Sequence, residues 1–106
     1  MKVTHDDTRY EAMEQRLMKE LVQTVAVYLD KAGLKDAQLR ELTTKIAFSV
    51  AEVIDGSAHM DFEDDHLVPV LAFAEGRMRD KLLAPKFGGS SMHEFTHGLV
   101  KEVFTE

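Results

Sequence analysis

Apolar residues recur every three or four positions in the first half of the chain, most clearly over residues 39–54. Charged side chains fall between them, so the apolar side chains share one face of a helix. Such a face cannot stay in water, and other segments must cover it. The pattern predicts a helix over residues 37–55, with Asp36 as its N-cap.

A second stretch with the same spacing precedes it and predicts a helix over residues 8–32. The polar residues 6–8 are good N-cap candidates, because their short side chains can accept hydrogen bonds from the first turn. Gly33 follows the last apolar position, and glycine is the usual residue just beyond a helix end. These signals bound the helix at both ends.

The second half of the chain shows two more apolar stretches, which predict helices over residues 66–83 and 91–104. Pro69 is tolerated in a first helical turn, which supports the start of the third helix. Residues 84–89 are rich in proline and glycine and are expected to form a loop. Ser90 or Ser91 would then cap the fourth helix.

Four amphipathic helices with short connections predict an all-α fold, a small four-helix bundle of up-down-up-down topology. At 106 residues the chain is expected to form a single helical domain over residues 1–106. The apolar stripes of the first and third helices are broad. We therefore expect that a homodimer could use the surplus apolar surface.

Charge and composition exclude several classes of function. The net charge is -6 and the chain has no cysteine. An acidic chain is not expected to bind nucleic acid or an anionic membrane surface, because both need clustered lysine and arginine. Thiolate chemistry and cysteine-type zinc sites are excluded. Residues 1–7 are polar, without a following apolar run, so the predicted location is cytoplasmic.

The sharpest motif is His93-Glu94-Phe95-Thr96-His97, an H-E-x-x-H pentapeptide on the last predicted helix. Two histidines four residues apart can bind one zinc ion, and the glutamate between them can act as a general base on zinc-bound water. The pentapeptide resembles the motif of zinc metalloproteases. That resemblance implies a zinc hydrolase with His93 and His97 as ligands and Glu94 as base.

A related pattern occurs twice, as Glu63-x-x-His66 and Glu94-x-x-His97. The pair resembles the ligand motifs of ferritin-like di-iron bundles. That resemblance implies iron, with further carboxylate ligands from the first two helices. The candidates for these are Glu11, Glu14, Glu20, Glu41 and Glu52.

The same residues also have an explanation without metal. Ser91 and Glu94 have the spacing of a capping box, in which the serine and glutamate side chains satisfy backbone N–H groups at the helix start. His93 and His97 then lie at the edge of the helix face that packs on the core. We favour this interpretation, and no cofactor is then needed.

Four acidic residues between positions 61 and 65 account for most of the net charge: Asp61, Glu63, Asp64 and Asp65. We interpret this segment as the contact for another protein. The predicted function is therefore a small acidic protein-interaction or regulatory module without catalytic activity, whose partner the sequence does not identify. The alternative is a metal-binding bundle that uses His93 and His97, with a zinc hydrolase-like or di-iron-like site. A small-ligand sensor is a third possibility, for which the sequence contains no marker.

Overall fold

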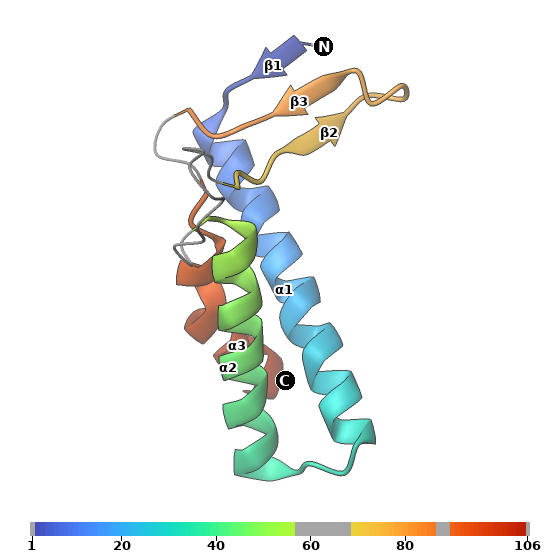
Figure 1. Cartoon of the computed structure of the whole chain (residues 1–106), viewed down its shortest axis with the longest axis vertical. Helices are drawn as coiled ribbons and strands as arrows, with labels where there is room; N and C mark the ends of the chain where they lie inside the picture. Colours follow the sequence, from blue (N-terminus) through green and yellow to red (C-terminus); the bar gives the residue numbers. More distant parts are fainter. Residues whose placement is uncertain (1, 57–68, 87–89, 106) are drawn as a thin grey trace, which may run out of the picture.

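Two long helices form the frame of the molecule: α1 (Asp7–Lys31) and α2 (Asp36–Ile54). They run antiparallel and are joined by a short turn at one end (Figure 1). The shorter helix α3 (Thr96–Thr105) packs behind this pair in the same view. In this computed structural model the described residues are 2–56, 69–86 and 90–105.

Helix α1 lies close to the predicted range of 8–32 and uses the predicted end signals. The Asp6 side chain accepts a hydrogen bond from the Arg9 backbone N–H at 3.1 Å, which caps the first turn. At the other end, Gly33 has a φ of +102°. Its N–H donates to the Asp30 carbonyl at 3.0 Å, and this reversal of the chain ends the helix.

Helix α2 also lies close to its predicted range of 37–55, but the predicted cap is wrong. Lys35 occupies the N-cap position, and no side chain caps it. Asp36 is the first helical residue and has a φ of +52°. Three small residues, Thr43, Ala47 and Ala51, are fully buried along one face of α2. Their spacing of four residues lets the neighbouring helices approach α2 closely.

The predicted four-helix, up-down-up-down bundle is wrong, because the fold is α/β: three helices and a small three-stranded mixed sheet among the described residues. The predicted third helix over residues 66–83 is replaced by strands β2 (Phe73–Glu75) and β3 (Lys81–Leu83). Positions 66–68 lie outside the described residues. Gly76 and Arg79 have φ values of +84° and +54°, which interrupt any helix through this stretch.

The sheet has the order β1-β3-β2, with β1 (Lys2–Thr4) parallel to β3 and β2 antiparallel to β3. It lies at the end of the molecule where α1 begins (Figure 1). Glu75 of β2 forms an ion pair with Arg9 of α1 at 2.6 Å. The hydrogen bond from Arg9 is the main reason why the pKa of Glu75 lies below its ordinary value. This pair ties the sheet to the first turn of α1.

The last predicted helix, over residues 91–104, is divided into two parts. A 3₁₀ turn occupies Met92–Phe95, and α3 begins only at Thr96. The H-E-x-x-H pentapeptide therefore spans the join between a 3₁₀ turn and an α-helix.

The core lies where α1, α2 and the last helix meet. Its fully buried apolar residues come from all three elements: Met18, Val22, Ala47, Ala51, Met92 and Val100. None of the helices in the described part of the chain is both long and apolar enough to cross a lipid bilayer.

Candidate functional site

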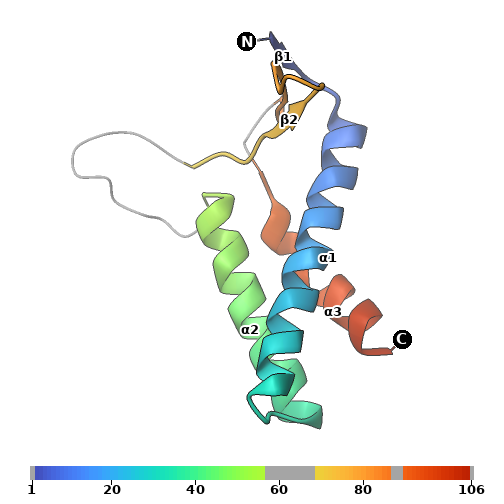
Figure 2. The same cartoon turned by 90° about the vertical axis from the view of Figure 1, so that its right-hand side faces the viewer.

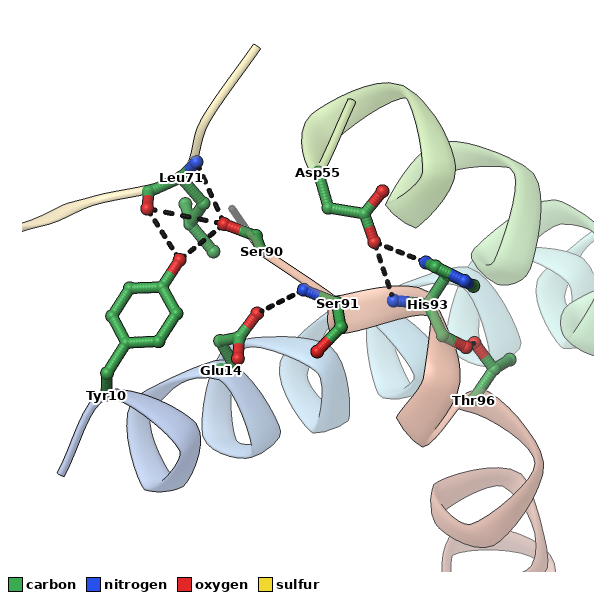
Figure 3. Close-up of polar contacts among 8 residues, drawn as sticks. All are labelled: Tyr10, Glu14, Asp55, Leu71, Ser90, Ser91, His93 and Thr96. Carbon is green, nitrogen blue, oxygen red and sulfur yellow. Dashed lines mark hydrogen bonds and ion pairs between the residues drawn. The ribbon is translucent and has the colours of Figure 1, made fainter. Parts of the chain in front are cut away.

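Buried polar residues gather where α1, the end of α2 and the start of the last helix converge (Figure 3). We call this group the polar joint. Its members are Tyr10, Glu14, Asp55, Leu71, Ser90, Ser91 and His93. Leu71 takes part through its backbone, and the others through side chains or backbone N–H groups.

Asp55 holds the start of the 3₁₀ turn from the end of α2. Its side chain is 0% exposed, and its Oδ2 accepts a hydrogen bond from the His93 backbone N–H at 3.0 Å. The same oxygen lies 2.5 Å from His93 Nδ1. Because the carboxylate accepts from Nδ1–H, Nε2 is the ring nitrogen that carries the lone pair when the imidazole is neutral.

Glu14 holds the same turn from α1. It is 3% exposed, and its Oε2 accepts a hydrogen bond from the Ser91 backbone N–H at 3.0 Å. Burial raises the pKa of Glu14, the Ser91 hydrogen bond opposes the shift, and the Asp55 carboxylate adds to it. Two carboxylates from distant segments thus satisfy backbone N–H groups at the start of the 3₁₀ turn, the positive end of its dipole.

The predicted capping box of Ser91 and Glu94 is not formed. Ser91 occupies the N-cap position, but its side chain makes no capping hydrogen bond, and Glu94 is exposed. The Ser91 N–H, which the Glu94 side chain was expected to bind, donates to Glu14 instead, and the Glu94 N–H donates to the Ser91 carbonyl at 3.0 Å. Asp55 binds the N–H of His93, between them.

Tyr10 connects the joint to the segment that leads into β2. Its hydroxyl donates to the Leu71 carbonyl at 2.6 Å and is also hydrogen-bonded to Ser90 Oγ. The Leu71 N–H donates to Ser90 Oγ at 3.1 Å. Burial is the largest reason why the pKa of Tyr10 is raised. In the sequence, Tyr10 is one more large residue near the start of the predicted helix over residues 8–32, and a lone tyrosine offers no signal of these long-range bonds.

His93 and His97 lie on the same side of the last helix, against the Phe48 ring of α2. The ring centroid of Phe48 lies 5.4 Å from that of His93 and 6.2 Å from that of His97. Glu94 instead borders a hollow beside α1. No three histidine, aspartate or glutamate side chains among the described residues are grouped closely enough to hold a metal ion.

The other candidate iron ligands lie on the two long helices, Glu11 and Glu20 on α1 and Glu41 and Glu52 on α2. Glu63 and His66, the second E-x-x-H pair, lie outside the described residues, as does the predicted partner contact of Asp61, Glu63, Asp64 and Asp65.

The hollow beside α1 has a volume of about 370 Å³ and an acidic lining. Its walls are Asp7, Tyr10, Glu11, Glu14, Pro85, Ser91, Glu94 and Phe95. Four carboxylates around one opening repel anions, so this hollow does not suit a phosphate or a nucleic acid.

A second surface stands out for its apolar character. Six large apolar side chains of α1 and α2 are more than a third exposed. Val27, at 49%, is turned from Tyr28 by roughly 100° around α1. We call the surface of the other five the open face. They are Leu17 at 37%, Tyr28 at 67%, Leu42 at 37%, Val50 at 37% and Val53 at 48%.

Helical geometry places the open face on the side of the hairpin away from α3. Lys19 of α1 forms an ion pair with Glu102 of α3 at 2.7 Å, and Leu17 is turned from Lys19 by roughly 200° around the helix. Phe48 of α2 contacts the histidines of the last helix, and Val53 is turned from Phe48 by roughly 140°. Figure 2 shows α3 on one side of the α1–α2 pair only.

No family model matches this sequence, and comparison of the chain with curated proteins and with solved structures finds no match.

Proposed function

We propose that the protein is a non-catalytic interaction module that docks through the open face of its helical hairpin. The observation that supports this is a stripe of large apolar side chains across two helices, on the side that α3 leaves bare. Scattered exposed apolar residues are ordinary on a protein surface, whereas an apolar stripe along adjoining helices is typical of a docking site.

The face of α2 next to the open face is closely packed against the rest of the protein. The small residues Thr43, Ala47 and Ala51 are fully buried on the adjoining face of α2, so the helix that carries the stripe is held rigidly. A rigid face loses little conformational entropy on binding, which favours affinity. Lys45 and Glu52 flank the stripe on α2, so its rim carries both signs of charge although the chain as a whole is acidic.

The acidic segment with Asp61, Glu63, Asp64 and Asp65 stays a predicted second contact. Asp61 follows Ile54, the last residue of α2, by seven positions in the sequence. Its four carboxylates favour basic groups on the surface that they contact.

Site-specific photo-crosslinking in cells tests the proposal. A photoreactive amino acid replaces Val53 in one variant and Arg16 in the matched control, because Arg16 is an exposed α1 residue off the open face. We expect a protein adduct from position 53 and none from position 16. Absence of an adduct at position 53, or equal adducts from both positions, would refute docking through this face.

One observation favours a second candidate function, metal binding by His93 and His97. In metal sites, a carboxylate often binds the histidine nitrogen that does not face the metal, which fixes the tautomer and orients the ring. Asp55 binds His93 Nδ1 in this way and leaves Nε2 for a metal. His93 Nε2 and a nitrogen of His97 would supply two ligands for Zn²⁺ or iron. Glu94 borders the hollow beside α1, whereas both histidines face Phe48, so the described structure does not bring the glutamate to them.

Calorimetric titration of untagged protein with Zn²⁺ and with Fe²⁺ tests this second function. His97→Ala should abolish binding. Glu94→Gln is the matched control and should leave the affinity for either metal unchanged, because Glu94 borders the hollow beside α1. Absence of saturable binding by the unmodified protein would exclude the metal site.

A further inference from the structure

We infer that the occupant of the open face is a second copy of this chain, with the two α2 helices packed antiparallel across a two-fold axis. This inference rests on the proposed function and names its partner. The two-fold axis would pass through the turn Ala47–Ser49 in the middle of α2.

The apolar stripe of α2 is symmetrical about that turn. Leu42 lies about as far before the turn as Val53 lies after it, and Ile46 and Val50 are related in the same way. In an antiparallel pair of identical helices, a two-fold axis at the turn sets Leu42 of one copy against Val53 of the other, and Ile46 against Val50. A face that docks on itself in this way is what a closed two-fold dimer requires.

The spacing of the stripe suits helix-on-helix packing. Positions 42, 46, 49 and 53 alternate steps of four and three residues, as do the core positions of a coiled coil. Ser49 is the small, exposed member of this series and lies at the centre of the seam. A small residue at the crossing point lets the two backbones approach closely, so the larger side chains on either side can interdigitate.

The charges that flank the stripe follow the same symmetry. Lys45 precedes the central turn by about as much as Glu52 follows it. The antiparallel arrangement therefore brings Lys45 of each copy to Glu52 of the other and forms the contact twice. Within its own helix, Lys45 Nζ forms an ion pair with Glu41 Oε1 at 2.9 Å. The lysine side chain therefore extends along the rim toward the start of α2. Two acidic chains would repel each other elsewhere, and this rim offers local attraction.

Charge reversal at the rim tests both the partner and its orientation. Lys45→Glu and Glu52→Lys each turn two attractive contacts into repulsive ones, and each should weaken self-association about tenfold at low salt. The double variant Lys45→Glu, Glu52→Lys should restore the dimer. An equimolar mixture of the two single variants should form mixed dimers in preference to dimers of either variant.

Sedimentation equilibrium measures the association constants, and circular dichroism confirms that each variant is folded. All the altered side chains are exposed or at the surface of α2, so folding should be preserved. Arg16→Glu is the matched control, because it changes the net charge as Lys45→Glu does but lies off the open face. It should leave the dimer unchanged at moderate salt.

Val53→Asp places a charge in the seam and should abolish the dimer. A dimer that survives Val53→Asp or both single reversals would overturn the α2 seam. The unmodified protein could instead be monomeric while position 53 still crosslinks to a different polypeptide. That result would overturn the second copy as the occupant but would still support docking through the open face. A monomer that gives no crosslink at position 53 would refute both.

Discussion

Replacement of Thr43 by valine should stabilise the protein. Thr43 is 0% exposed, and its hydroxyl has no hydrogen-bond partner within the described part of the chain. Leaving a buried hydroxyl unpaired costs about 1–3 kcal/mol relative to water. Valine has nearly the same shape and helix propensity, so Thr43→Val removes this cost without a cavity. We expect a gain of about 1–2 kcal/mol in the free energy of unfolding, or a melting temperature raised by about 5–10 °C.

Two other threonines provide matched controls for this prediction. Thr96 is equally buried, but its Oγ1 donates to the His93 carbonyl at 2.7 Å, so Thr96→Val should cost about 1 kcal/mol. Thr44 is partly exposed and donates to the Arg40 carbonyl at 2.8 Å, so Thr44→Val should change stability by no more than about 0.5 kcal/mol. Urea unfolding followed by circular dichroism measures all three. If Thr43→Val and Thr96→Val destabilise the protein equally, the Thr43 hydroxyl is paired and the reasoning is refuted.

Three further predictions concern the polar joint and the glycines. Burial raises the pKa of Glu14, so the folded state binds more protons than the unfolded state above pH 4.5, and stability falls as pH rises through that window. Glu14→Gln removes this loss, and its advantage over the unmodified protein in urea should grow from pH 4.5 to pH 7. Asp55→Ala breaks two hydrogen bonds from His93 to a buried carboxylate and should cost about 3 kcal/mol, and a double-mutant cycle with His93→Ala should show a coupling of at least about 1 kcal/mol. Gly33→Ala should cost about 1 kcal/mol in thermal unfolding because φ is +102° there, whereas Gly98→Ala within α3 should gain up to about 1 kcal/mol, since a methyl group at either position meets open space.

The two long helices could be predicted from the sequence because each repeats its apolar pattern over many turns. Helix α1 covers Asp7–Lys31 and α2 covers Asp36–Ile54, both close to the ranges that the spacing indicates. Their ends were less certain, since Asp36 lies inside α2 with a positive φ rather than at its N-cap.

The sheet could not be predicted, because its strands are three residues long and too short to show alternation. The run Val70–Ala74 is apolar throughout, and such a run fits a buried helix or a strand equally well. Gly76 was the available signal against a helix, and it has a φ of +84° in the turn between β2 and β3. The partner of β3 on its other side, β1, is more than seventy residues away, and no local pattern reports such a pairing.

The polar joint was found only in part, for the same reason. The H-E-x-x-H pentapeptide drew attention to His93, but its hydrogen-bond partner Asp55 is 38 residues away in the sequence. Glu14 is 77 residues from Ser91, whose N–H it binds. A local capping box was the simplest local explanation, and the tertiary fold replaced it with two remote carboxylates.

Those two carboxylates explain why one face of the hairpin stays bare. Glu14 and Asp55 belong to different helices of the hairpin, and both bind backbone N–H groups of the same 3₁₀ turn. Because a backbone N–H points in a fixed direction, this double attachment permits one placement of the turn and of α3 behind it. Burying Glu14 is costly, as its raised pKa indicates, and a neutral acceptor would avoid that cost. What a buried carboxylate adds is specificity, because moving α3 to the other side of the hairpin would break the hydrogen bonds from the Ser91 and His93 N–H groups. The polar joint thus directs α3 to one side of the hairpin and leaves the open face uncovered by that helix.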